Sequence, residues 1–249
     1  MKRRIAIVLA VLCGALAAVL CQAPAALLDL GVRQASEGRV RIADARGSAW
    51  NGEGVILADA AAGHGALPLG QLGWRLAGFR DGALEIALAF DGRPLGRLRL
   101  DVTGIGTTVA DWRLPAAETL ALLPGALGRG QWEGQLALTG ADGRCDWLGR
   151  CTGHAQLAWS GAATRRIENG ALGDYQLALD GNDGRVDFEL SSGEGPIALT
   201  GKGRWQQGQL RFDGLARGND AVLSQFPGFL GKVFEATGRP GEYRITVER

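Results

Sequence analysis

The sequence has few of the residues from which catalytic and metal sites are built. It contains two histidines, two tyrosines and one methionine among 249 residues, and no Gly-x-Ser-x-Gly motif. His64 and His154 stand far apart, without the spacing of paired metal ligands. Net charge is also low, because 27 Lys and Arg residues balance 26 Asp and Glu residues. These absences argue against an enzyme, a metal or other cofactor, and a nucleic-acid partner.

The first 30 residues predict a membrane segment. Basic residues at positions 2–4 precede an apolar run over residues 5–21, and no further charge occurs before Asp29. A spanning helix needs about 17–25 residues, and the basic cluster stays in the cytoplasm under the positive-inside rule. We therefore expect a single-pass inner-membrane anchor over residues 1–28, with its N-terminus in the cytoplasm, and a periplasmic domain over residues 29–249.

A cleaved signal peptide is the alternative, because Ala23-Pro24-Ala25 resembles a small-x-small cleavage site. Two features favour the anchor: the run exceeds the usual signal core of about 7–15 residues, and its apolar character resumes after the site. Cys13 and Cys21 lack the preceding residues of a lipoprotein signal. Both alternatives export the rest of the chain.

The exported part predicts many short strands. Apolar residues alternate there with polar or small ones, as in strands with one covered face. The clearest segments are 39–43, 83–90, 96–102, 134–138, 175–179, 185–190, 196–199, 209–212 and 243–247. Turn dipeptides separate them, at Asp91-Gly92, Asp142-Gly143, Asn169-Gly170 and Asp183-Gly184. We expect a mainly β fold: an extended, curved antiparallel meander with few short helices.

Helical patterns are rare outside the N-terminal segment. Residues 114–123 have a proline near a first turn and leucines at helical spacing. Residues 219–226 form a second candidate, which a proline interrupts and which resumes at 229–234. Residues 24–34 are expected to prolong the anchor outward.

Four tryptophans suggest an internal duplication. They are Trp50, Trp74, Trp132 and Trp159. Equivalent members of the two pairs are 82 and 85 residues apart, which predicts repeats at about 36–125 and 128–236 in one continuous, groove-like sheet. A third Trp-x-x-Gly at Trp205 fits this scheme less well. We interpret the four as structural anchors of the core, with a sugar platform or lipid groove as the alternative.

Two cysteines lie close together in the exported part. Cys145 and Cys151 bracket a five-residue, loop-like stretch. An oxidising periplasm permits a disulfide there, and so short a loop would contribute about 2–3 kcal/mol. Two unpaired thiols are the alternative. A zinc site is disfavoured, because His154 supplies only a third ligand.

Several motifs carry a family resemblance through their order along the chain. They are Gly47-x-x-Trp50-x-Gly52-x-Gly54, Leu69-Gly70-x-Leu72-x-Trp74-x-Leu76, Leu114-Pro115-Ala116-Ala117, Gly153-x-Ala155-x-Leu157-x-Trp159, Leu172-Gly173-x-Tyr175 and Leu199-x-Gly201-x-Gly203-x-Trp205. With the N-terminal apolar segment, this order resembles the type II secretion system protein N family over nearly the whole chain. That family looks related to the AsmA-like envelope proteins, which share an anchor and a long sheet folded into a groove.

The resemblance implies an accessory, non-enzymatic component of the inner-membrane platform of Gram-negative bacteria. Such a component would support the secretion of folded periplasmic proteins across the outer membrane. Its expected partners are other platform proteins, which an exposed sheet edge would bind by strand addition, and the inner membrane. The alternative is an AsmA-like lipid-handling protein with lipid in its concave groove. A periplasmic hydrolase is disfavoured, since no nucleophile–base motif is present.

Overall fold

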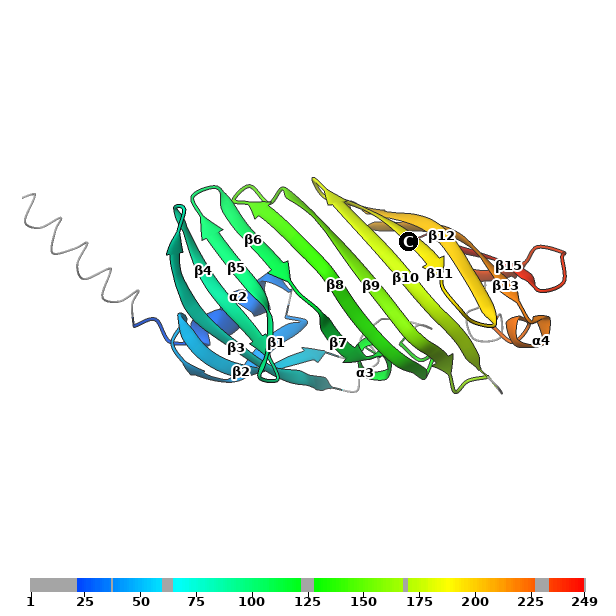
Figure 1. The fold of residues 1–249 in the computed structure, drawn as a ribbon, viewed down its shortest axis with the longest axis horizontal. Coiled ribbons are helices and arrows are strands. Elements are labelled where there is room, and N and C mark those ends of the chain that lie inside the picture. Colours follow the sequence, from blue (N-terminus) through cyan, green and yellow to red (C-terminus); the bar gives the residue numbers. More distant parts are fainter. Residues whose placement is uncertain are drawn as a thin grey trace, which may run out of the picture.

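The computed structural model of the protein describes residues 22–36, 38–59, 65–121, 128–167, 170–226 and 233–248. Within these ranges one antiparallel sheet of 15 strands forms most of the chain, and it twists along the length of the molecule (Figure 1). The strands are β1 (Val40–Gly47), β2 (Asn51–Asp59), β3 (Ala66–Arg80), β4 (Ala83–Phe90), β5 (Arg93–Asp101), β6 (Gly104–Val109), β7 (Trp112–Pro115), β8 (Trp132–Asp146), β9 (Cys151–Thr164), β10 (Ala171–Asn182), β11 (Arg185–Ser192), β12 (Ile197–Gln206), β13 (Gln209–Gly218), β14 (Phe234–Ala236) and β15 (Glu242–Glu248). The helices in these ranges are α2 (Ala26–Ala35), α3 (Ala116–Leu120) and α4 (Asp220–Leu223).

The strands pair almost entirely in sequence order. The order across the sheet is β1-β2-β3-β4-β5-β6-β8-β9-β10-β11-β12-β13-β15-β14, and β7 also pairs with β8. The expected antiparallel meander is therefore confirmed. Its tight turns use residues at positive φ, as at Asp91 (47°) with Gly92 (75°) and Asp183 (46°) with Gly184 (81°). These left-handed conformations suit two-residue hairpin loops.

One predicted turn is wrong. Asp142-Gly143 lies inside β8, close to a register shift between Thr139 and Asp142 where β8 pairs with β9. The strand continues through a local irregularity of the β-bulge kind. The Asp-Gly dipeptide does not form a turn there, because its residues pair with two neighbouring strands, β6 and β9. Asn169, in another predicted turn, is outside the described residues.

The predicted helices are shorter than expected. Leu114 and Pro115 belong to β7, and among the described residues of this segment, which end at residue 121, Ala116–Leu120 is helical. Pro115 is extended (ψ 133°) as the N-cap of α3, and a residue preceding proline is also biased to extended backbone. The second candidate is confirmed in part: α4 begins after Asn219, whose side chain accepts the N–H of Ala221 at 2.9 Å. The continuation through 229–234 lies outside the described residues except at its end, where Phe234 is in a strand.

The predicted anchor run over residues 5–21 lies outside the described residues. Among the residues that are described, no helix is both long and apolar enough to cross a membrane. Residues 26–28 form the start of α2, which packs Leu28 and Val32 against a core cluster containing Trp74. Asp29 of this helix accepts the backbone N–H of Ile42 at 2.6 Å. This helix thus covers the start of the sheet.

The sheet curves around its apolar side. Four strand spacings separate β3 from β8 in the sheet order, which is about 19 Å in a flat sheet at about 4.8 Å per strand. The five-residue helix α3 nevertheless contacts both strands. A helix of this length reaches both only because the sheet bends toward it.

The two faces of the sheet differ in chemistry. We call apolar face the side that carries Ile86 and its register partners. By register, the central positions of this face are Leu84, Ile86, Leu88, Leu98, Leu100, Ile105, Thr107, Leu157, Leu177, Leu179, Phe188, Leu190, Gly201, Gly203, Phe212, Gly214 and Ile245. None of these residues carries a charge. The intervening residues form the opposite, charged face.

The apolar face is buried at two clusters. One contains Ala25, Ile42, Trp74 and Ile86 below α2. The second contains Trp132, Ala162, Ile167, Leu172, Tyr175, Ile197, Ala216, Leu223, Phe226, Phe234 and Tyr243. Residues of the same face nearer the other strand ends, such as Leu100 and Leu179, are only half-buried. The apolar face is therefore only partly covered by other residues of the chain.

Strand packing predicts a contrast between two glycines. A Cβ at Gly96 would overlap the backbone carbonyl oxygen of Thr108, whereas a Cβ at Gly73 would lie 3.8 Å from the Cβ of Ala89. We expect Gly96→Ala to lower the free energy of unfolding by about 1–3 kcal/mol, since the backbone has to shift. The matched control Gly73→Ala should change it by less than about 1 kcal/mol. Urea denaturation of both variants measures this, and equal midpoints would contradict the packing described.

Candidate interaction surfaces

The four tryptophans singled out in the sequence lie in two groups rather than one site. Trp74 and Trp132 are buried, with 4% and 6% exposure, and belong to the two different core clusters. Trp159 packs edge-to-face on Trp132, with ring centroids 5.6 Å apart. Trp50 is half-buried in the β1/β2 turn. Their surroundings are those of packing residues.

Two of these tryptophans make equivalent hydrogen bonds. The indole N–H of Trp74 donates to the carbonyl of Ser48, and that of Trp159 donates to the carbonyl of Glu133, both at 2.9 Å and both 26 residues back. This equivalence supports the duplication hypothesis. The sheet itself runs through both halves without a break.

The charged face carries pairs of opposite charge across neighbouring strands. Examples are Asp187–Arg204 at 2.7 Å and Glu189–Lys202 at 3.2 Å. His154 Nδ1 lies 2.7 Å from Asp142 Oδ1 on the same face. The hydrogen bond from Arg204, helped by Arg185, lowers the pKa of the Asp187 carboxyl. Exposed pairs of this kind add little stability each. They leave the face nearly neutral.

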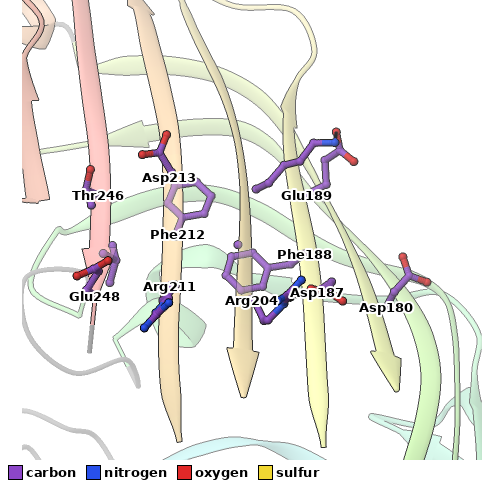
Figure 2. Close-up of a pocket in the computed structure, with 13 residues that line it drawn as sticks. Asp180, Asp187, Phe188, Glu189, Arg204, Arg211, Phe212, Asp213, Thr246 and Glu248 are labelled. Atoms are coloured by element: carbon purple, nitrogen blue, oxygen red, sulfur yellow. Dashed lines mark hydrogen bonds and ion pairs between the residues drawn. The ribbon is translucent and has the colours of Figure 1, made fainter. Parts of the chain in front are cut away.

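Two open hollows of about 510 and 560 Å³ lie over this charged face. Figure 2 shows the first, where Arg204 and Asp187 form an ion pair between the neighbouring strands β12 and β11. The second extends over β4–β6 and β8–β10 and shares Asp180 with the first. Within the described part of the chain, no group of three metal-ligating side chains occurs. The first hollow contains the ion pairs of Asp187 and Glu189 with Arg204 and Lys202.

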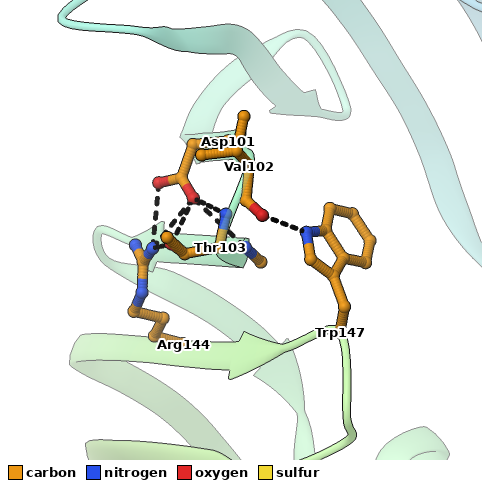
Figure 3. Close-up of polar contacts among 6 residues, drawn as sticks. Asp101, Val102, Thr103, Arg144 and Trp147 are labelled. Carbon is orange, nitrogen blue, oxygen red and sulfur yellow. Dashed lines mark hydrogen bonds and ion pairs between the residues drawn. The ribbon is translucent and has the colours of Figure 1, made fainter.

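A third feature was missed by the sequence reasoning: two neighbouring turns meet at one sheet edge. The β5/β6 turn contributes Asp101, Val102 and Thr103, while β8 and its turn contribute Arg144 and Trp147 (Figure 3). Arg144 Nη2 lies 2.9–3.0 Å from both carboxylate oxygens of Asp101. The indole N–H of Trp147 donates to the carbonyl of Val102 at 3.1 Å. We call this assembly the paired tip.

The paired tip is braced from within. Cys145 and Cys151 stand opposite each other at the end of β8 and β9 and are joined by a disulfide. Between them, one carboxylate oxygen of Asp146 accepts the backbone N–H groups of Leu148 and Arg150, both at 2.9 Å. The turn therefore holds its shape through local bonds. Cysteines bracketing an Asp-Trp-Leu-Gly-Arg turn were the only sequence signal for it.

The carboxylates of the paired tip are held ionised. Hydrogen bonds from Thr103 and then Arg144 keep the pKa of Asp101 well below its usual range. The backbone N–H of Arg150, and then its side chain, lower the pKa of Asp146. Each negative charge thus has a positive partner beside it. Despite this polar frame, Val102 is 90%, Leu148 81% and Trp147 59% exposed.

These observations define a single-sheet protein with one charged face, one uncharged face and a braced apolar tip. A protein-family model described as type II secretion system (T2SS), protein N, matches residues 38–246. The chain belongs to this family. The match runs from before β1 into β15, so it covers nearly the whole sheet. No curated protein and no solved structure gives a match. A relation to the AsmA-like group is not supported by these comparisons.

The disulfide predicts a modest stabilisation. The double variant Cys145→Ser, Cys151→Ser should lower the free energy of unfolding by about 2–3 kcal/mol, because a closed loop this short removes limited chain entropy from the unfolded state. Urea denaturation with and without reductant measures it. Reductant should lower the wild-type midpoint to that of the double variant, which itself should not respond. An unchanged wild-type midpoint would contradict the bracing role.

The paired tip also predicts an acid-sensitive stability. The pKa of Asp101 is lower in the folded protein than its usual value of 3.8 in the unfolded chain. The ionised carboxylate therefore stabilises the folded state at pH values above 3.8, and this contribution to the free energy of unfolding decreases as the pH falls below 3.8. Asp101→Asn should therefore reduce the difference between denaturation midpoints at about pH 7 and about pH 3. Asp81→Asn in the adjacent β3/β4 turn is the matched control. The same loss of pH dependence in both variants would contradict a specific role of Asp101.

Proposed function

We propose that this protein is an accessory, non-enzymatic component of the type II secretion system that supports the secretion of folded periplasmic proteins across the outer membrane. The observation that carries the proposal is the family match over residues 38–246. The charged face agrees with it, since several of its carboxylates, such as Asp187 and Glu189, are paired with cations on the neighbouring strand. A structural part of a machine needs such surfaces more than a reactive cleft.

The proposal includes a place in the cell envelope. The basic residues at 2–4 and the apolar run at 5–21 would anchor the chain in the inner membrane with its N-terminus in the cytoplasm. The 15-stranded sheet would then lie in the periplasm. The disulfide between Cys145 and Cys151 supports this side of the membrane, because disulfides persist in oxidising compartments.

One sheet edge offers a site for other platform proteins. β14 pairs with β15 only at Tyr243–Ile245, and among the described residues Thr246–Glu248 pair with β13 alone. Unpaired strand edges accept a further strand through backbone hydrogen bonds. At the opposite end of the sheet, β1 is irregular between Ala43 and Arg46 and is packed against α2. The β15 edge is therefore the better candidate for strand addition.

A second candidate function rests on the apolar face. Its central positions are uncharged, and several are only half-buried, including Leu98, Leu157 and Leu177. A surface of this kind suits a lipid chain as well as a covering protein. Native mass spectrometry of the protein extracted in mild detergent separates the two, because a lipid-handling protein should retain lipid in a fixed ratio.

Deletion of the gene tests the secretion role. We expect substrates of the secretion system to accumulate in the periplasm and to fall in the medium, with recovery when the full chain is supplied in trans. Immunoblots of both fractions measure it, and a periplasmic marker that is not secreted controls for leakage. Unchanged secretion together with unchanged assembly of the inner-membrane platform would rule out this function.

A further inference from the structure

Exposed apolar residues gather along one edge of the sheet. Because the meander reverses at every hairpin, the turns β3/β4, β5/β6, β8/β9, β10/β11 and β12/β13 all lie on the same edge, along the top of Figure 1. Beside or within these turns lie the exposed Phe79 (73%), Val102 (90%), Trp147 (59%), Leu148 (81%) and Trp205 (46%). We call this edge the turn edge.

The opposite edge is different. Its described turns include Asp91-Gly92 and the stretch 193–196, which consist of glycine, proline and acidic residues. Ile167, in the turn between β9 and β10, is buried. Among the residues that the structure describes, no large apolar side chain is exposed in a turn of this edge. The asymmetry marks the turn edge as an interaction surface, since clustered exposed apolar residues signal a partner.

The paired tip is the most organised part of that edge. The indole N–H of Trp147 already donates to the carbonyl of Val102. Transfer of this ring out of water therefore leaves the indole N–H with a hydrogen-bond partner. The N–H groups of Leu148 and Arg150 are bonded to the Asp146 carboxylate. The acidic groups are likewise matched, by Arg144 and Arg150. The free-energy cost of removing this tip from water is therefore low for a polar turn.

The start of the described chain lies toward the same strand ends. The backbone N–H of Ala49, in the β1/β2 turn, donates to the carbonyl of Ala23 at 2.8 Å, and that of Ala25 donates to the carbonyl of Gly47 at 3.2 Å. By the alternation of the meander, the β1/β2 turn points toward the strand ends that form the turn edge, but it is level with Arg75 of β3 and stops short of Arg80 at the β3/β4 turn. An anchor that precedes Ala23 would thus join the sheet on the side of the strands that ends in the paired tip.

We propose that the paired tip, through Val102, Trp147 and Leu148, inserts into the surface of the lipid bilayer that anchors the chain. The proposal rests on the membrane anchor of the proposed function. The charges of Arg144 and Arg150 at the tip are paired with Asp101 and Asp146. The contact with the bilayer would therefore be stabilised by burial of apolar surface and not by attraction to anionic headgroups. The second contact would restrain the sheet relative to the membrane, with the charged face and the β15 edge left free for protein partners.

Photo-crosslinking in intact cells tests this insertion. A photoreactive amino acid replaces Val102 or Leu148 in the full chain, and the purified protein is analysed for adducts by mass spectrometry. We expect phospholipid adducts at both positions. Their yield should be about tenfold that at the control position Glu194, which lies in a turn of the opposite edge; a tenfold ratio corresponds to a free-energy difference of about 1.4 kcal/mol. Exchange of Trp147 for Ser, combined with the probe at Leu148, should remove most of the excess.

Other results overturn the proposal. A crosslinked band of protein size at both positions identifies a protein partner for the tip, and adducts no more frequent than at Glu194 show that the tip faces water. Membrane fractionation and secretion are measured in the same cells. A membrane-bound chain that restores secretion but gives no lipid adduct refutes the tip contact alone. A chain absent from the membrane fraction refutes both the anchor and the tip contact.

Discussion

The register of one antiparallel ladder is the constraint on which this structure depends. Side chains alternate between faces along a strand, so a slip of one residue would exchange the charged and uncharged faces. Cross-strand partners such as Phe188 with Gly203 and Leu179 with Phe188 keep apolar beside apolar or small residues over many strands. Where a turn or a bend requires an extra residue, the shift is absorbed locally, as between Thr139 and Asp142.

A single layer of sheet leaves one apolar side to cover, and this protein covers it in part. α2 closes one end, and side chains from α3 and α4, such as Leu120 and Leu223, pack in the second cluster. Trp132, Trp159 and Tyr175 fill the curve there. The remainder of the face is half-buried. In the described part of the chain, the apolar face is therefore a partly exposed surface over much of its area.

The β15 edge and the turn edge of the sheet differ in the kind of partner that each can bind. Among the described residues, Thr246–Glu248 of β15 pair with a strand on one side only, and the turn edge has apolar side chains on a disulfide-braced frame. A protein strand and a lipid surface differ in what they recognise, since one needs hydrogen-bonding groups and the other needs groups that tolerate loss of water. Both edges are available together because they lie along different sides of the sheet. The charged face remains open between them.

The sequence by itself indicated the alternation of the strands and the largely sequential antiparallel meander, because hairpin turns and period-two patterns are local signals. The order of its motifs indicated the family. It also singled out the two cysteines and, among four tryptophans, Trp74 and Trp132 of the two core clusters. Only the tertiary structure decided that Asp142-Gly143 continues a strand and that Val102 meets Trp147. These outcomes depend on pairing between β5/β6 and β8/β9, segments separated by more than 40 residues. A local pattern carries no information on which strand lies beside which, or on the register that brings two turns into contact.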